Sequence, residues 1–273
     1  MPPLPPHVFR RTVENMTTIA VAGGTGLAGR AVVAEAVAAG QAVRSLSRHL
    51  PAEAHRVAGA EYMRADFRTG AGVAAALAGV DALVETMDAR SGPGLRALPV
   101  MSVAALGAAA RAGVGRCVLL TIVRAGECTM GYYQAQAARA LSYEKSALPT
   151  SVVYATQFHN LVAGIFSAGA KAGLIPVFNG VYFQTISTAD VAAVLLAEAL
   201  RGSAAKKSVF AGGPAVQGMR EMAETWQAAT GSRALVAPLP LPGSFGAFLR
   251  AGKNLVPDHA VGVTSFESWL GKH

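Results

Sequence analysis

Three glycines, Gly23, Gly26 and Gly29, lie between a short apolar run and a segment with helical periodicity. Glycine at these points permits a sharp turn, a close approach of backbone N–H groups to a ligand, and tight packing of a helix on a strand. The start of the helix adds unpaired N–H donors and partial positive charge, which suit a pyrophosphate. The spacing in this context predicts a dinucleotide-binding loop in which Thr25 and Leu27 also contact the ligand. A glycine-rich turn without a ligand is the alternative.

Ser47 and Arg48, at the end of the second apolar run, indicate which dinucleotide is bound. A site for NAD usually has a carboxylate here that accepts a hydrogen bond from the ribose 2′-hydroxyl. The first carboxylate after this run is Glu53. Because Ser47 and Arg48 can bind a 2′-phosphate through charge-assisted hydrogen bonds, we expect NADP(H), with NAD(H) less favoured. The alternative for Arg48 is a solvated surface side chain.

Asp66 and Phe67 follow the third apolar run, at a corner that we expect beside the adenine. Asp66 can accept a hydrogen bond from the adenine amino group, and Phe67 can line the same pocket. The alternative for Asp66 is a cap on the next turn.

The scaffold that must position these residues is an alternation of short apolar runs and helical patterns. This alternation predicts an α/β fold of the Rossmann type, a doubly wound parallel sheet with a small C-terminal α/β lobe. The strands are expected at 18–22, 42–47, 61–65, 81–85, 116–123 and 150–154, and the helices at 28–39, 98–112 and 132–146.

The second half of the chain is less regular, with helices expected at 160–172, 188–200 and 219–230, strands at 185–187 and 208–211, and an extended linker at 238–242. We therefore expect a flexible N-terminal extension over 1–16 and a dinucleotide-binding core over 17–155. Residues 156–273 are expected to form mainly a substrate-binding lobe that is interleaved with the core.

The bulk composition narrows the class of protein. The chain has 273 residues, of which 52% are hydrophobic and 15% charged, so extensive disorder is not expected. Its net charge of +8 is spread over small clusters without a zinc-finger spacing, so neither nucleic acid nor a metal is expected as a ligand. We expect no membrane span and no secretory signal. Cys117 and Cys128 are expected to be reduced, as in a cytoplasmic protein.

Several motifs together resemble the NmrA-like branch of the atypical short-chain dehydrogenases/reductases. They are the glycine loop with Arg48, the segments 121–123, 131–133, 155–159 and 186–192, and the segment 266–270 near the C-terminus. The resemblance runs from about residue 17 to the C-terminus and implies a Rossmann core with a C-terminal lobe over the nicotinamide. It also implies an NAD(P)H-dependent reductase of quinones, conjugated ketones or other hydrophobic carbonyl compounds, or a non-catalytic protein that senses the dinucleotide.

The sequence departs from this family at the catalytic pair. Short-chain reductases protonate the carbonyl oxygen with a tyrosine, and a lysine four residues later lowers the pKa of that tyrosine. None of the six tyrosines here has a lysine at that spacing, and Tyr132 is followed by Gln136. Gln136 keeps a hydrogen bond to a ribose possible but removes the positive charge. A tyrosine without that charge is a poor acid–base catalyst at neutral pH.

Four residues are the candidates for chemistry: Thr121, Tyr132, Tyr133 and His159. His159 could donate a proton near neutral pH, or it could be an ordinary loop or capping residue. Tyr133 could instead only pack against the lobe. We expect an NAD(P)H-dependent oxidoreductase that reduces a hydrophobic carbonyl, enone or quinone without the usual tyrosine–lysine pair. A non-catalytic NADP(H)-sensing protein, or an enzyme of a non-redox step, is the alternative, and a homodimer remains open.

Overall fold

The computed structural model describes residues 16–202 and 205–272. Its main feature is a seven-stranded sheet in the order β3-β2-β1-β4-β5-β6-β9, with every neighbouring pair parallel. The strands are β1 (Thr18–Ala22), β2 (Ala42–Ser47), β3 (Ala60–Arg64), β4 (Ala82–Glu85), β5 (Arg116–Ile122), β6 (Thr150–Ala155) and β9 (Lys207–Ala211). This order, which reverses direction between β1 and β4, confirms the predicted Rossmann-type α/β fold.

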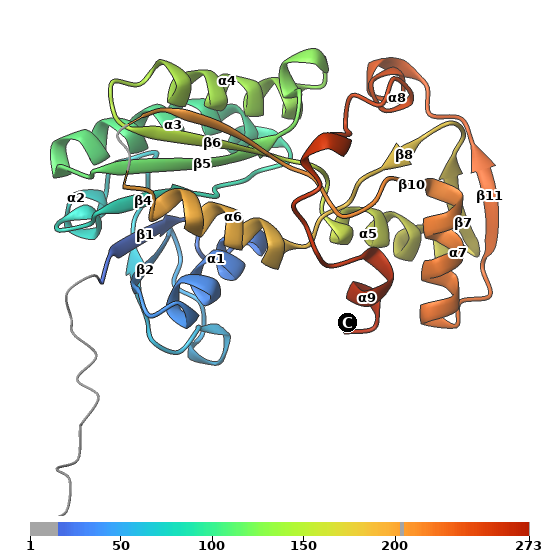
Figure 1. Cartoon of the computed structure of the whole chain (residues 1–273), viewed down its shortest axis with the longest axis horizontal. Helices are drawn as coiled ribbons and strands as arrows, with labels where there is room; N and C mark the ends of the chain where they lie inside the picture. Colours follow the sequence, from blue (N-terminus) through green and yellow to red (C-terminus); the bar gives the residue numbers. More distant parts are fainter. Residues whose placement is uncertain (1–15, 203–204, 273) are drawn as a thin grey trace, which may run out of the picture.

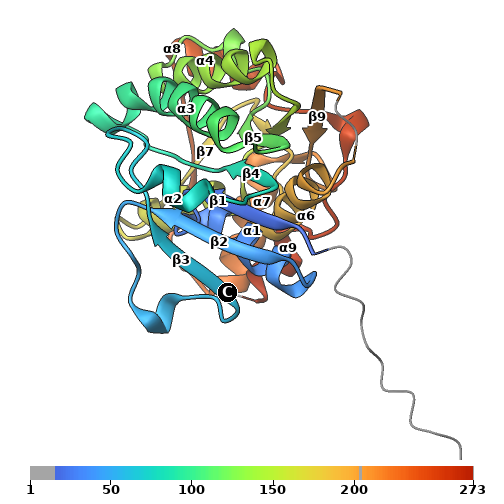
Figure 2. The same cartoon turned by 90° about the vertical axis from the view of Figure 1, so that its left-hand side faces the viewer.

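Helices cover both faces of this sheet (Figures 1 and 2). One face carries α1 (Leu27–Ala38) and α6 (Thr188–Ala199), and the other carries α2 (Val73–Leu77), α3 (Gly92–Ala112) and α4 (Gly131–Lys145). The strands have apolar side chains on both faces because both are covered: in β1, Ile19 and Val21 pack with α1 and α6, whereas Ala20 and Ala22 pack on the opposite side.

Helix α3 is longer than expected, because it begins at Gly92 instead of Leu98. Within the described residues it is the one helix long and apolar enough to cross a membrane by length and composition, whereas the sequence predicted no such segment. One side of α3, including Leu98, Ser102 and Leu106, is buried. The helix packs on α2 and α4.

The C-terminal lobe stands beside the sheet (Figure 1). It contains α5 (His159–Ala170), α7 (Met219–Thr230), α8 (Gly243–Arg250) and α9 (Phe266–Leu270), with the strands β7 (Leu174–Phe178), β8 (Tyr182–Phe183), β10 (Gln217–Gly218) and β11 (Leu235–Leu239). β11 pairs parallel with β7, and β10 pairs antiparallel with β8. Because α6 and β9 return to the core between these elements, core and lobe are interleaved along the chain.

Several expectations for this region and for the N-terminus need correction or lie outside the structure. Residues 185–187 do not form a strand, because Ile186 makes only an isolated bridge to Phe158. The linker expected at 238–242 begins inside β11. Pro238 is tolerated in this strand because a strand of a two-stranded sheet has one edge without a partner, where the missing N–H is not needed. Apart from Met16, the expected extension 1–16 lies outside the described residues. Residues 16–202 and 205–272 also contain three short 3₁₀ turns: η1 (Glu53–His55), η2 (Ala125–Glu127) and η3 (Pro257–His259).

Candidate functional site

A cavity of about 640 Å³ lies at the carboxyl ends of the central strands. The loops after β1, β2, β3, β4 and β5 and the segment after β6 line it, and Phe245 of α8 closes it from the lobe. The cavity therefore spans the point between β1 and β4 where the strand order reverses, which is where ligands bind in open α/β sheets.

The glycine loop forms one wall of this cavity. Gly23 has φ +81°, in the left-handed region that favours glycine, and its N–H donates to the Leu46 carbonyl at 3.0 Å. A Cβ at Gly29 would collide with the carbonyl oxygen of Gly23, so the start of α1 approaches the strand only because this residue has no side chain. The predicted residues Gly23, Thr25, Gly26 and Leu27 line the cavity, whereas Gly29 packs behind the loop. This cradle fits the pyrophosphate of a dinucleotide, because the first N–H groups of α1 have no helical acceptor.

One end of the cavity is basic. Ser47 and Arg48 line it as predicted, together with His49 and Arg68, which the sequence had not singled out. The hydroxyl of Ser47 donates to the His49 carbonyl at 2.7 Å, which orders the turn, and the Arg48 side chain is exposed. Cationic side chains around this end suit a phosphate group.

Asp66 and Phe67 line the same end of the cavity. Phe67 is buried in the core beneath it. Asp66 Oδ1 accepts a hydrogen bond from the Arg68 backbone N–H at 2.9 Å, so this carboxylate does cap the following turn. That contact uses one carboxylate oxygen and is compatible with the predicted place beside a base.

Tyr132, in the first turn of α4, points toward the loop after β4. Its hydroxyl donates to Asp88 Oδ1 at 3.0 Å. Burial, and then the nearby Asp88 carboxylate, raise the pKa of Tyr132 above its ordinary range. A neighbouring lysine would shift the pKa of Tyr132 in the opposite direction, because a positive charge stabilises the phenolate.

Tyr133 lines the cavity but is 5% exposed, and its ring packs on Phe245 and Phe248. Its hydroxyl accepts a hydrogen bond from Gln157 Nε2 at 3.4 Å. Burial raises the pKa of Tyr133 to about 12. Tyr133 thus packs against the lobe, which is one of the two alternatives that the sequence offered, and it also faces the cavity.

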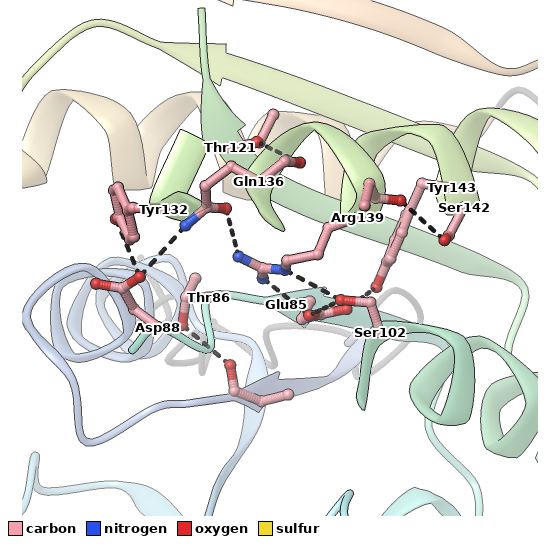
Figure 3. A network of polar contacts seen from close by, with 12 residues as sticks. Glu85, Thr86, Asp88, Ser102, Thr121, Tyr132, Gln136, Arg139, Ser142 and Tyr143 are labelled. Carbon is pink, nitrogen blue, oxygen red and sulfur yellow. Dashed lines mark hydrogen bonds and ion pairs between the residues drawn. The ribbon is translucent and has the colours of Figure 1, made fainter. Parts of the chain in front are cut away.

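Gln136, where the family has its lysine, links the cavity to a buried ion pair (Figure 3). Its Nε2 donates to Asp88 Oδ1 at 3.3 Å, and its Oε1 accepts from Arg139 Nη1 at 2.6 Å. Arg139 in turn binds Glu85 at 2.8 Å and the hydroxyl of Ser102 at 3.0 Å. The positive charge missing from position 136 is thus present one helical turn later, but the carboxylate of Glu85 neutralises it.

Of the two remaining candidates for chemistry, Thr121 lies on the cavity wall and His159 does not. Thr121 lines the cavity and donates to the Gln136 carbonyl at 3.2 Å. The prediction of His159 as a proton donor is wrong, because the ring is fully buried outside the cavity. Its Nε2 faces the Thr264 carbonyl at 3.0 Å, and its Nδ1 contacts the Thr185 hydroxyl at 2.7 Å, so both nitrogens hold the lobe together.

Besides His49 and Arg68, the cavity is lined by further residues that were not predicted as functional, among them Asp88, Arg139, Gln157 and Phe245. Arg139 had a local signal, because it lies three residues after Gln136 and shares its helix face. Asp88 lies three residues past β4, at the carboxyl ends of the strands, where ligands bind in open α/β sheets. Phe245 comes from a distant segment, and nothing local in the sequence indicates it.

Comparison with known proteins agrees with this geometry. The family of NAD(P)H-binding proteins matches residues 23–201. No curated protein matches the chain. An NADPH-dependent quinone oxidoreductase from Escherichia coli has a similar structure, with TM-score 0.75 and 16% identity over 93% of this chain and 98% of that one.

Two further solved structures are similar. An epimerase from Methanothermobacter thermautotrophicus gives TM-score 0.76 with 14% identity, over 94% of this chain and 90% of that one. A Citrobacter triphenylmethane reductase complexed with NADP(H) gives TM-score 0.68 with 17% identity, over 93% of this chain and 95% of that one. At these identities the likeness concerns the fold. Together with the family match over more than half of the sequence, the loop and the cavity identify the chain as a member of the NAD(P)H-binding family of Rossmann-fold proteins.

Proposed function

We propose that the chain is an NADPH-dependent oxidoreductase that reduces a flat, hydrophobic acceptor such as a quinone, an enone or another conjugated carbonyl compound. One observation carries this proposal: a single cavity joins the glycine loop and the basic end at Arg48 to an apolar wall. The side chains of that wall are Met87, Met130, Phe158, Leu161 and Phe245. Such a wall suits an acceptor with a large apolar face.

The preference for NADPH over NADH rests on the basic end. Arg48, His49 and Arg68 line it, and a 2′-phosphate there would receive charge-assisted hydrogen bonds. The dinucleotide supplies the hydride when it is bound. The glycine loop orients the dinucleotide through backbone N–H groups. Phe245, which belongs to the lobe, covers the cavity on the side of the lobe.

The chain offers little help with proton transfer, and this restricts the acceptor. The Tyr132 hydroxyl donates a hydrogen bond to Asp88, and loss of its proton would put a phenolate beside a carboxylate. Gln136 adds no charge to oppose this. Acceptors whose reduced anion is delocalised need little proton assistance, whereas an isolated ketone needs a strong donor. Quinones and enones fit this site better than simple ketones do.

The names of the structural relatives support the same class. One is a quinone oxidoreductase and another a triphenylmethane reductase. These names support our proposal that the chain belongs to the NmrA-like branch of the atypical short-chain dehydrogenases/reductases. An epimerase is equally similar in fold, and a nucleoside-diphosphate-sugar epimerase from Staphylococcus aureus is also similar. Epimerisation of a nucleotide sugar is therefore the competing activity without net redox change.

The test is to follow loss of the reduced-nicotinamide absorbance when NADPH is mixed with the protein and a panel of quinones, enones and simple ketones. We expect turnover with quinones and enones and little with simple ketones. Tight binding of NADPH without turnover of any acceptor would favour a dinucleotide-sensing protein. The hydroxyl groups of Tyr132 and Tyr133 are both hydrogen-bonded within the protein, which is consistent with that alternative. Interconversion of nucleotide sugars without net NADPH loss would favour the epimerase.

A further inference from the structure

Asp88 is an exposed carboxylate on the cavity wall that the proposed reaction does not use directly. One of its oxygens, Oδ1, accepts hydrogen bonds from both the Tyr132 hydroxyl and Gln136 Nε2 (Figure 3). Among the described residues, none forms a hydrogen bond or an ion pair with Asp88 Oδ2. Two donors on one oxygen fix the carboxylate and leave the second oxygen as a well-placed acceptor.

Gln136 is fixed beside it with its donor group facing the same way. Arg139 donates to Gln136 Oε1, and Arg139 is itself held by Glu85 and Ser102. Turning the amide over would place its NH₂ group against the guanidinium, so the carbonyl must face Arg139 and the NH₂ must face Asp88. The cavity wall therefore presents an acceptor and a donor next to each other.

Their place on the sheet indicates which part of a dinucleotide they meet. A doubly wound sheet binds one nucleotide over each half, on either side of the reversal in strand order. The basic end at Arg48 and Asp66 belongs to the half that contains β2 and β3, whereas Asp88 and Gln136 lie beyond β4, in the other half. The sugar of the second nucleotide, the nicotinamide ribose, carries two adjacent hydroxyls, each of which both donates and accepts.

We propose that Asp88 is a binding residue for this vicinal diol, accepting a hydrogen bond at Oδ2 from one hydroxyl while Gln136 Nε2 donates to the other. The site thus replaces a cationic ribose anchor by an anionic acceptor and a neutral donor. This inference rests on the proposed binding of NADPH.

The test compares two ligands by isothermal titration calorimetry. NADPH carries both nucleotides, whereas adenosine 2′,5′-bisphosphate carries only the adenosine half. For Asp88→Ala we expect NADPH to bind about tenfold more weakly, as for loss of a hydrogen bond to a charged group. Binding of adenosine 2′,5′-bisphosphate should stay within about twofold of the unmodified chain, because Asp88 does not face that half.

Two further variants calibrate the comparison. Arg48→Ala should weaken both ligands, because it lies at the shared adenosine end. Glu224→Ala, an exposed glutamate on α7 in the lobe, should weaken neither. If Asp88→Ala proves unstable, Asp88→Asn keeps the shape of the side chain and should show a smaller loss confined to NADPH.

Unchanged NADPH affinity in a folded Asp88 variant overturns the inference while the proposed function stands. Equal weakening of both ligands also overturns it, because Asp88 would then act on the site as a whole. If the unmodified chain binds neither ligand, the proposed function itself falls, and the inference falls with it.

Discussion

The hydroxyl of Tyr132 donates a 3.0 Å hydrogen bond to Asp88, a carboxylate, and the residue four positions after this tyrosine is Gln136, which carries no positive charge. The pKa of Tyr132 is raised by burial and by that carboxylate. The contact between Tyr132 and Asp88 therefore makes Tyr132 a weaker proton donor to a bound acceptor.

Gln136→Lys restores the usual tyrosine–lysine spacing. An ammonium group near Tyr132 should lower the pKa of the phenol, because a nearby positive charge stabilises the phenolate. We expect tyrosinate to form at lower pH in a spectrophotometric titration of the variant. Ala138→Lys, on an exposed position of the same helix, is the matched control and should leave the titration unchanged. If the titration of Gln136→Lys is unaltered, the side chain at position 136 does not lie close enough to the Tyr132 phenol to change its pKa, and the prediction is contradicted.

Arg139→Met should be costly to stability. The substitution leaves the carboxylate of Glu85 buried without its partner, and breaking a buried ion pair in this way costs about 3–5 kcal/mol of unfolding free energy. Chemical denaturation measures the loss.

The double variant Glu85→Gln with Arg139→Met removes both charges and should recover part of this loss. Lys253→Ala, which breaks an exposed pair with Glu127, is the control and should leave the free energy of unfolding nearly unchanged. A double variant less stable than both single variants would show that the pair is not the source of the effect.

His159 should make folding stability depend on pH. Burial lowers the pKa of His159 below its ordinary value of 6.5, so the unfolded chain takes up a proton at a pH where the folded chain does not. Stability from this residue is therefore fully present above about pH 6.5 and is lost as pH falls below it. His159→Gln should reduce the slope of unfolding free energy against pH in that window. His55→Gln, at an exposed position, is the control and should keep the slope.

Arg48→Ala should change the choice of cofactor. Loss of a charge-assisted hydrogen bond to the 2′-phosphate should raise the KM for NADPH about tenfold and leave the KM for NADH nearly unchanged. Steady-state kinetics with both cofactors and one quinone measures this. A parallel loss with NADH would place Arg48 elsewhere than at the 2′-phosphate.

Phe245→Ala should affect the acceptor and not the cofactor. The Phe245 ring lines the cavity and lies 5.6 Å from the ring of Tyr133, so its removal widens the apolar wall. We expect a higher KM for a bulky quinone and an unchanged affinity for NADPH. A weakened NADPH affinity would instead indicate that α8 holds the cofactor.

The sequence predicted the scaffold and the cofactor loop because both depend on local patterns. Buried parallel strands are short apolar runs, and the loop needs Gly23 and Gly26 at a set distance from a strand. The same reasoning placed Ser47, Arg48 and Phe67 on what became the cavity wall. It also detected that Gln136 replaces the lysine, since that is a matter of spacing alone.

Only the tertiary structure decided the chemistry of the second half of the site. The partners of Gln136, Asp88 on one side and Arg139 on the other, come from a loop and a helix whose approach no local pattern specifies. His159 has the residue type of a proton donor, but packing of the lobe buries it against Thr185 and Thr264. Residue types and spacings determine which groups are available, whereas long-range packing determines which of them share a cavity and which charge each one faces.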